Sequence, residues 1–488
     1  MITTPEHNRR LICLTKGDLK NGLVRVKGLR GMLPSGCVGQ SKKSKGLGRT
    51  IRIWLQGINR WIETDIASEA KTGFARGHFR ERRWTKKFFI HHNIKCGDKI
   101  EFERLGELEY RLRPLGAIPR FAEFFAGIGL VRLALEDCGF QTVFANDIDP
   151  DKLALYRDNF TTEEFRLGDI HLVRQEEIPD CDLATASFPC TDLSIAGQMN
   201  GINSGESSAF WGLTRLLDEM GRRRPPVVLL ENVPGFLIAN GGKDFEAAML
   251  SLNALGYACD AFLLDAAAFV PQSRLRLFVV GRLESIESGF SFVPTILRPP
   301  VLAEYIASHA NIRWSLRELP SPPKRTTTLE SILEDLEDDD PAWWSKERAD
   351  YFVGQFSERH AAIAKRMIAP KSYSYATAFR RVRKGRSMAE LRTDGLAGCL
   401  RTPRGGSGRQ ILFKAGNNRY QVRLLTAREC ARLQGVPDTY SINVPLNKAL
   451  FGFGDAVCVR VIEWIAEHYL LPCLANAASQ DPVPGGMA

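Results

Sequence analysis

The chain has 488 residues, of which 44% are hydrophobic and 25% are charged, and its formal net charge is +10. This composition is typical of a soluble globular protein of about three domains, and it excludes a disordered tail, a collagen-like fibre and a disulfide miniprotein. No apolar run reaches the about 20 residues that cross a bilayer, and residues 1–10 lack the apolar core of a secretory signal. We expect a cytoplasmic protein with no membrane partner.

The eleven cysteines are spread from Cys13 to Cys473 without a C-x-x-C pair. This spacing predicts neither a disulfide framework nor a zinc site. We therefore expect a reducing compartment and no metal.

The first region of the sequence, residues 1–115, carries the excess positive charge. The first 120 residues hold 26 Lys and Arg against 11 Asp and Glu, whereas the remainder of the chain holds 40 against 45. Such asymmetry indicates a domain that faces a polyanion, or a basic surface kept for solubility. The segment KIEFERLGELEYRL at 99–112 alternates apolar and charged residues around Gly106, which predicts a β-hairpin in a mainly β domain.

In this region aromatic residues also alternate with Arg and Lys, a pattern found on protein surfaces that bind nucleic acid. We nevertheless expect most of the aromatic side chains to be core. The six in question are Trp54, Trp61, Phe79, Trp84, Phe88 and Phe89.

In the second region, residues 116–295, predicted strands alternate with predicted helices. We expect strands at 121–125, 142–145, 183–187, 227–230, 261–264 and 277–280, and helices at 130–137 and 244–255. Several strands are continuous apolar runs, as expected when helices cover both faces of a sheet. The pattern predicts an α/β fold with an open, mostly parallel sheet.

A glycine-rich turn follows the first of these strands, in Ala126-Gly127-Ile128-Gly129. Gly-x-Gly between a strand and a helix lets the backbone approach a ligand closely, although a tight turn without a ligand gives the same pattern. The dinucleotide fingerprint requires a third glycine where this chain has Arg132, which counts against NAD.

Two acidic residues follow the next strand ends. Asp147 stands where a carboxylate can hold both hydroxyls of a ribose, and Asp169, between Gly168 and Ile170, suits an adenine amine. Together with the glycine turn, these residues favour an adenosyl group without pyrophosphate over a dinucleotide.

The strand at 183–187 leads into Phe188-Pro189-Cys190. Ligands of open α/β sheets lie beyond the carboxyl ends of the strands, so Cys190 stands where a substrate would bind. Most cysteines are inert small apolar residues, but Pro189 restricts the backbone before this sulfur and a polar, Gly-containing segment follows it. We interpret Cys190 as a candidate nucleophile.

The next strand ends at Glu231, which either caps the following helix or acts as an acid. Burial disfavours an ionised carboxyl, and a carboxyl so tuned can donate a proton near neutral pH. Arg274 and Arg276 then open the strand at 277–280 with a period of two, which directs both side chains to one face. There they could orient an acid or hold an anion.

The third region, residues 296–440, shows no alternation of predicted strands and helices. The α/β pattern returns at 441–475, with an amphipathic helix near 457–470. The third region begins with a Pro-rich sequence, which is followed by an acidic patch at 334–340 and then by a basic segment. Its basic residues are Arg380, Arg381, Arg383, Lys384, Arg386, Arg401, Arg404 and Arg409.

The ordered motifs resemble those of the DNA (cytosine-5) methyltransferase family. They are AEFFAGIGL, ANDID, GDI, SFPC, ENVPGF, QSRLR and FGFGDAV, and they cover roughly residues 120–470. The resemblance implies a doubly wound catalytic domain over 116–295 and 441–475, a target-recognition domain inserted over 296–440, and S-adenosylmethionine as methyl donor, which leaves as S-adenosylhomocysteine. Arg423-x-x-Thr426-x-x-Glu429 resembles the family's late structural motif.

By position, the resemblance implies a role for each site residue. Cys190 would be the nucleophile, Glu231 would engage the edge of the cytosine ring, and Arg274 and Arg276 would support the active site. The implied donor-site residues are Phe125, Gly127, Gly129, Asp147, Ile148, Asp169, Ile170, Pro189 and Asp455.

Two donor-site residues depart from the family pattern. Asp455 replaces the asparagine usual after Gly454, which places a charge near the donor's amino-acid end. Ile148 replaces a residue that is often aromatic, so we expect dispersion contact with adenine in place of stacking.

The implied chemistry explains these residue types. Addition of a thiolate at C6 of cytosine makes C5 a nucleophile, and Glu231 would relieve the charge on the ring through N3 and the 4-amino group. A base stacked in a duplex cannot be reached, so the target must flip out. The basic segment at 380–409 would hold the opened duplex.

Four readings follow from the sequence. The leading one is a DNA cytosine-5 methyltransferase that modifies a specific duplex sequence in a restriction-modification system, with a cognate restriction endonuclease as an expected partner. The others are a tRNA cytosine-5 methyltransferase, a catalytically silent DNA-binding protein, and a nuclease in the first domain built on Asp65 and Glu69-Ala70-Lys71. The segment WTKKFFIHHNIKCGDKIEF is similar to B3-like pseudobarrel DNA-binding domains. This resemblance implies a second DNA contact.

Overall fold

The computed structural model describes residues 9–26, 29, 31–34, 36–55, 60–70, 72, 74–92, 94–114, 119–189, 209–283, 293–383, 385–402 and 408–477. The chain divides into two compact units, one of residues 1–119 with 475–488 and one of residues 120–474. Each unit has hydrophobic core clusters of its own.

The first unit is built on a five-stranded sheet in the order β1-β6-β7-β3-β4. These strands are β1 (Arg9–Cys13), β3 (Ile51–Leu55), β4 (Arg60–Thr64), β6 (Lys99–Arg104) and β7 (Glu109–Pro114). The antiparallel pairing of β6 with β7 confirms the predicted hairpin. A small sheet of β2 (Val38–Gly39) and β5 (Ile66–Ala67), with helices α1 (Lys16–Asn21) and α2 (Arg83–His91), completes the unit.

Most of the aromatic side chains of this unit are core, as predicted. Phe79, Trp84, Phe88 and Phe89 are buried in one cluster. Trp54 and Trp61 are half-buried on paired strands, with ring centroids 5.5 Å apart.

The second unit holds a seven-stranded sheet in the order β10-β9-β8-β11-β12-β14-β13. All of its pairings are parallel except those of β14, which runs against both of its neighbours. The strands are β8 (Arg120–Phe124), β9 (Gln141–Asp147), β10 (Phe165–Leu167), β11 (Leu183–Ala186), β12 (Val227–Asn232), β13 (Ala258–Asp265) and β14 (Leu275–Arg282). The predicted open, mostly parallel sheet is confirmed.

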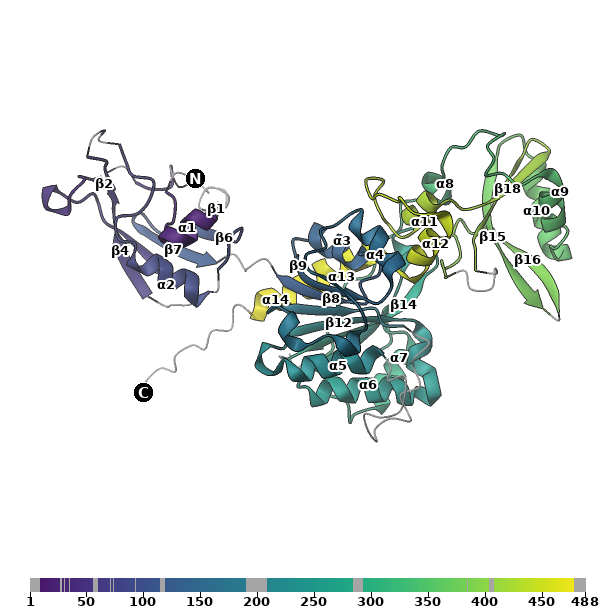
Figure 1. Cartoon of the computed structure of the whole chain (residues 1–488), viewed down its shortest axis with the longest axis horizontal. Helices are drawn as coiled ribbons and strands as arrows, with labels where there is room; N and C mark the ends of the chain where they lie inside the picture. The colour runs from purple at the N-terminus through teal and green to yellow at the C-terminus, as the bar shows by residue number, and fades with distance from the viewer. Residues whose placement is uncertain are drawn as a thin grey trace. The chain divides into compact units, whose positions relative to one another are not determined.

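Helices cover both faces of this sheet (Figure 1). The helices α3 (Leu130–Asp137) and α13 (Val459–Ile465) pack in one core cluster, and α5 (Ala209–Glu219), α6 (Lys243–Ala254) and α7 (Pro300–Ser308) pack in the other. Successive strand residues alternate between the clusters: Phe121 lies in the first and Ala122 in the second. This alternation explains why the strands are apolar throughout.

A separate four-stranded antiparallel sheet follows, in the order β16-β15-β17-β18. Its strands are β15 (Ser374–Arg383), β16 (Arg386–Arg392), β17 (Ile411–Gly416) and β18 (Arg419–Leu424). Helices α9 (Lys346–Val353) and α10 (Glu358–Ile368) share its core through Phe352 and Ala364. The remaining helices are α4 (Pro150–Arg157), α8 (Leu329–Ile332), α11 (Ala427–Leu433), α12 (Leu446–Asp455) and α14 (Leu471–Ala477).

The start of the predicted recognition segment packs on the catalytic sheet. Leu302 and Ile306 of α7, and Leu316 after it, belong to the same core cluster as α5 and α6. Arg282 at the end of β14 donates to Ser315, which fixes this segment against the sheet. The Pro-rich sequence at 296–300 therefore precedes a helix of the catalytic core.

The late motif forms the junction between β18 and α11. Thr426 caps α11, where its hydroxyl accepts a hydrogen bond from the Glu429 amide, and the Glu429 carboxylate accepts from the Thr426 amide. Glu429 also forms two bonds with Arg423, at 2.6 and 2.7 Å, with both side chains almost wholly buried. Glu429 is buried, is paired with Arg423 and is part of the N-terminal cap of α11, so it fixes the direction in which α11 leaves the sheet.

Candidate active site

The carboxyl ends of β8, β9, β11 and β12 lie at one edge of the catalytic sheet. The chain passes from β8 to β9 and β10 on one side and from β11 to β12 on the other, so the sheet order reverses between β8 and β11. A ligand crevice forms at such a reversal point in open α/β sheets. Since β14 is antiparallel, its first residues reach the same edge.

The glycine turn after β8 leaves space at this edge. Phe125, Gly127 and Gly129 all have positive φ, at 58°, 56° and 79°. A Cβ on Gly129 would lie 2.6 Å from the Phe160 ring, so a side chain there is excluded, whereas a Cβ on Gly127 would meet nothing closer than 3.9 Å. The backbone at Gly127 is therefore open to close approach by another group.

Asp147, the last residue of β9, is bound to that turn. Its carboxylate accepts hydrogen bonds from the amides of Gly127, at 2.7 Å, and Asp149, at 2.9 Å. Burial raises the pKa of Asp147, and the nearby Lys152 ammonium opposes that shift. The adjacent Ile148 is 65% exposed, so it offers an apolar surface beside the carboxylate.

Asp169 and Ile170 lie at the end of β10 with different surroundings. Asp169 caps a short turn by accepting from the His171 amide at 2.9 Å. Ile170 is 4% exposed and packs in the core close to Gly212 of α5. The sequence gives no sign of this burial.

Asp455, at the end of α12, lies close to the glycine turn. Its carboxylate forms an ion pair with Lys152 of α4 at 2.9 Å. The structure thus gives the unusual charge at this position a partner, which the sequence analysis did not identify.

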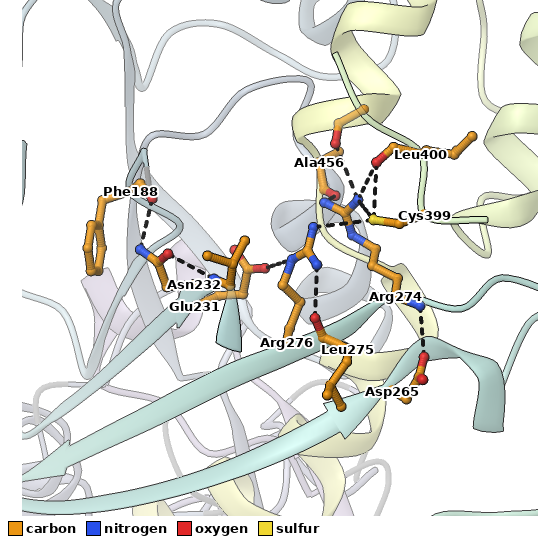
Figure 2. Close-up of polar contacts among 12 residues, drawn as sticks. Phe188, Glu231, Asn232, Asp265, Arg274, Leu275, Arg276, Cys399, Leu400 and Ala456 are labelled. Carbon is orange, nitrogen blue, oxygen red and sulfur yellow. Dashed lines mark hydrogen bonds and ion pairs between the residues drawn. The ribbon is translucent and has the colours of Figure 1, made fainter. Parts of the chain in front are cut away.

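The loop that carries the predicted nucleophile leaves β11 at the same edge. Pro189 is exposed, and Cys190 lies outside the described residues. The Asn232 side chain donates to the Phe188 carbonyl at 3.2 Å (Figure 2). Asn232 therefore ties the end of β12 to the backbone two residues before Cys190, a role that the sequence analysis missed.

Glu231 is held by Arg276. It is 7% exposed at the end of β12, and its Oε1 lies 2.9 Å from Nε of Arg276 (Figure 2). The pair fixes where this carboxyl group points.

Arg274 and Arg276 lie side by side, as the period of two predicts, but they have different partners. Arg274 is 3% exposed and donates to three backbone carbonyls, those of Leu400 at 2.9 Å, Gly454 at 3.3 Å and Ala456 at 2.7 Å. It therefore joins the start of β14 to two distant segments. Burial and the charge of Arg276 lower the pKa of Arg274.

Cys399 is a thiol at this edge that no motif of the sequence marks. Its sulfur lies 3.4 Å from Nη1 of Arg274 and 3.7 Å from Nη2 of Arg276 (Figure 2). Burial alone would raise the pKa of this thiol, but the two guanidinium groups lower it on balance. Arg276 thus connects Cys399 to Glu231.

The residues at this edge fit an adenosyl methyl donor. The open space at Gly127, the exposed apolar surface of Ile148 and the buried Asp147 carboxylate suit a backbone-proximal, nucleoside-like ligand. Among the described residues, no group of three or more His, Cys, Asp or Glu side chains is arranged to hold a metal ion.

The family model of the C-5 cytosine-specific DNA methylases matches residues 119–470. This chain belongs to that family. The match spans the glycine turn, the Glu231–Arg276 pair and the late junction described above. The family carries out cytosine-5 methylation of DNA, so the chain is a DNA cytosine-5 methyltransferase.

Most of the length of each curated relative in the methylase family aligns with this chain. Type II methyltransferase M.HhaI of Haemophilus parahaemolyticus is 28% identical over 352 residues, which is 71% of this chain and 93% of that protein. Type II methyltransferase M.HaeII of Haemophilus aegyptius is 29% identical over 346 residues, 70% of this chain and 90% of that protein.

Solved structures share the methylase fold. The Dnmt2 methyltransferase of S. pombe gives a TM-score of 0.50 at 21% identity and covers 74% of this chain and 99% of that chain. The methyltransferase EhMeth of Entamoeba histolytica gives a TM-score of 0.50 at 16% identity, covering 73% and 98%. Within the described part of the methylase, no helix is long and apolar enough to cross a membrane.

Proposed function

We propose that this methyltransferase acts on C5 of a cytosine flipped out of a specific duplex sequence, with S-adenosylmethionine as methyl donor. The observation that supports it best is the Glu231–Arg276 pair, buried at the sheet edge beside the loop that leads to Cys190. A buried carboxyl group held in one orientation at a ligand-binding edge suits recognition of a planar base edge.

The chain's residues divide the chemistry between them. The Cys190 thiolate would add to C6 of cytosine, which makes C5 nucleophilic. Glu231, oriented by Arg276, would hydrogen-bond N3 and the 4-amino group as charge develops on the ring. S-adenosylmethionine would supply the methyl group as an electrophile. Loss of the C5 proton to a base and departure of the Cys190 thiolate would restore the ring.

The donor would be held at the glycine turn. Gly127 would allow close backbone approach, Asp147 would take the ribose hydroxyls, and Ile148 would cover the adenine. The other proposed donor-site residues are Phe125, Gly129, Asp169, Ile170, Pro189 and Asp455. Since Ile170 is buried in the core, its proposed contribution is to support the adenine site from behind.

Duplex binding is assigned to the four-stranded sheet of the second unit and the segments that flank it. The β15–β16 hairpin carries Arg381 and Arg386 near its tip, both exposed, and Arg401 lies exposed beyond it. Arginines in such positions suit phosphate or guanine contacts. We propose that this region, within the 296–440 segment, is the target-recognition domain, and that the first unit adds a second DNA contact.

The relatives named as type II methyltransferases support a place in a restriction-modification system. The protein would then protect DNA from a cognate restriction endonuclease, and it would work in the cytoplasm, where that DNA lies.

Bisulfite sequencing of plasmid DNA treated with the protein and S-adenosylmethionine tests the proposal. We expect 5-methylcytosine at one position of a short recurring sequence. Methylation of tRNA in place of DNA, or no methylated site in a plasmid library that covers all short sequences, would contradict it.

A further inference from the structure

We propose that Lys152 and Asp455 form one charge pair that receives the amino-acid end of the methyl donor, Lys152 facing its carboxylate and Asp455 its ammonium group. The inference rests on the proposed donor. It assigns Lys152, which no motif of the sequence marks, as a donor-binding residue.

The pair lies beside the open glycine turn. Nζ of Lys152, from α4, lies 2.9 Å from Oδ2 of Asp455, from the end of α12. A Cβ on Gly127 would have Cδ of Lys152 as its nearest neighbour, at 3.9 Å, so the lysine stem borders the space at Gly127. Asp455 keeps 43% of its side chain exposed and can therefore accept a second partner.

Neighbouring carboxylates stabilise the charge of Lys152. Three carboxylates face it, from Asp147, Asp149 and Asp455. Burial would lower the pKa of Lys152, but these carboxylates raise it on balance, so the ammonium stays charged. The zwitterionic end of the donor adds one charge of each sign, and a neighbouring ammonium and carboxylate complement both.

Asp455 explains why the lysine is needed. An asparagine at 455, usual in the family, would present a neutral amide to the donor's carboxylate. A carboxylate in the same place would repel it, and Lys152 cancels that repulsion. The two residues are thus expected to be interdependent, so the effect of removing Lys152 should depend on the charge at 455.

The chain offers a matched control on the same two helices. Lys448 of α12 pairs with Asp151 of α4 at 2.7 Å, and both side chains are about half exposed. If Lys152 only joined the two helices, its loss and the loss of Lys448 should have similar effects on ligand binding.

Calorimetry with two ligands tests the proposal on the full-length protein. S-adenosylhomocysteine carries the amino-acid end, and 5′-methylthioadenosine lacks it. Lys152→Met should weaken binding of S-adenosylhomocysteine by about tenfold or more and leave binding of methylthioadenosine unchanged. Lys152→Arg should retain affinity, Lys152→Met/Asp455→Asn should recover most of it, and Lys448→Met should behave as wild type.

Three results would overturn the inference: unchanged S-adenosylhomocysteine affinity in Lys152→Met, equal weakening of both ligands, or no recovery in the double variant. Retained methylthioadenosine binding shows that a variant is folded. If the wild-type protein bound neither S-adenosylmethionine nor S-adenosylhomocysteine, the proposed donor itself would be refuted, which is a different outcome from a failure confined to Lys152.

Discussion

The Arg276 guanidinium lies between Glu231 and Cys399: its Nε is 2.9 Å from the glutamate Oε1, and its Nη2 is 3.7 Å from the cysteine sulfur. The three residues come from β12, from β14 and from the segment before β17. A single side chain therefore orients the proposed acid and contacts the segment between β16 and β17 of the four-stranded sheet.

Arg276→Met should reduce kcat about 10²–10³-fold, because Glu231 loses the group that orients it. Single-turnover methylation of duplex DNA measures this effect. Arg222→Met is the control, since Arg222 is exposed at the opposite edge of the sheet, before β12. Wild-type turnover in Arg276→Met would contradict the assigned role.

Cys190→Ser should abolish methyl transfer and leave DNA binding largely intact, because a serine hydroxyl is not ionised at neutral pH. With DNA that carries 5-fluorocytosine at the target, the wild-type protein should form a covalent, heat-stable complex, since fluorine cannot leave as a proton does. Denaturing gels detect that complex. Cys399→Ser is the matched control and should still form it; a complex in Cys190→Ser would refute the covalent route.

Glu123→Gln should stabilise the protein, increasingly as the pH rises from about 5 to 8. Glu123 lies within β8, 2% exposed, and burial raises its pKa to about 8. Between its ordinary value and about 8 the folded state binds the extra proton, so the stability of the wild-type protein falls as the pH rises. Urea unfolding at several pH values measures this trend, and a pH-independent difference between variant and wild type would contradict it.

Glu429→Ala should lower the free energy of unfolding by about 3–5 kcal/mol, because it leaves the Arg423 charge buried without its partner. Lys346→Ala removes one partner of an exposed ion pair with Asp350 and should cost less than about 1 kcal/mol. Chemical denaturation compares the two. Equal losses would show that burial does not determine the contribution of the Arg423–Glu429 pair.

The first unit should contribute to the salt dependence of DNA binding. Arg60, Arg83 and Lys87 line a pocket of about 300 Å³ around Trp84 and Ile62. Replacing the three cations with alanine should weaken DNA binding and reduce the slope of log K against log salt by up to about three. Fluorescence anisotropy across a salt series measures both, and an unchanged slope would argue against a DNA contact there.

Patterns local in sequence predicted the fold well. The continuous apolar run at 227–230 forms the first four residues of β12, the run at 277–280 forms the centre of β14, and the helix expected at 130–137 coincides with α3. These patterns succeed because burial on both faces of a sheet leaves a clear trace in each strand.

Contacts between distant segments could not be predicted in the same way. Cys399 meets Arg274 because the segment between β16 and β17 passes this sheet edge, and Lys152 meets Asp455 because the chain returns to the same edge after β18. Neither Cys399 nor Lys152 stands in a motif. The Pro-rich sequence at the start of the predicted recognition segment likewise does not reveal that α7, which follows it, is a core helix with Leu302 fully buried.

The packing of the last helices has a consequence for synthesis of the protein. Ile462 and Ile465 of α13 cover the sheet face that presents Leu229 and Phe262. About 180 residues separate the end of β14 from α13, so at ribosomal rates this apolar face waits roughly 10–35 s for its cover. The nascent chain is therefore expected to need chaperone protection until translation is nearly complete.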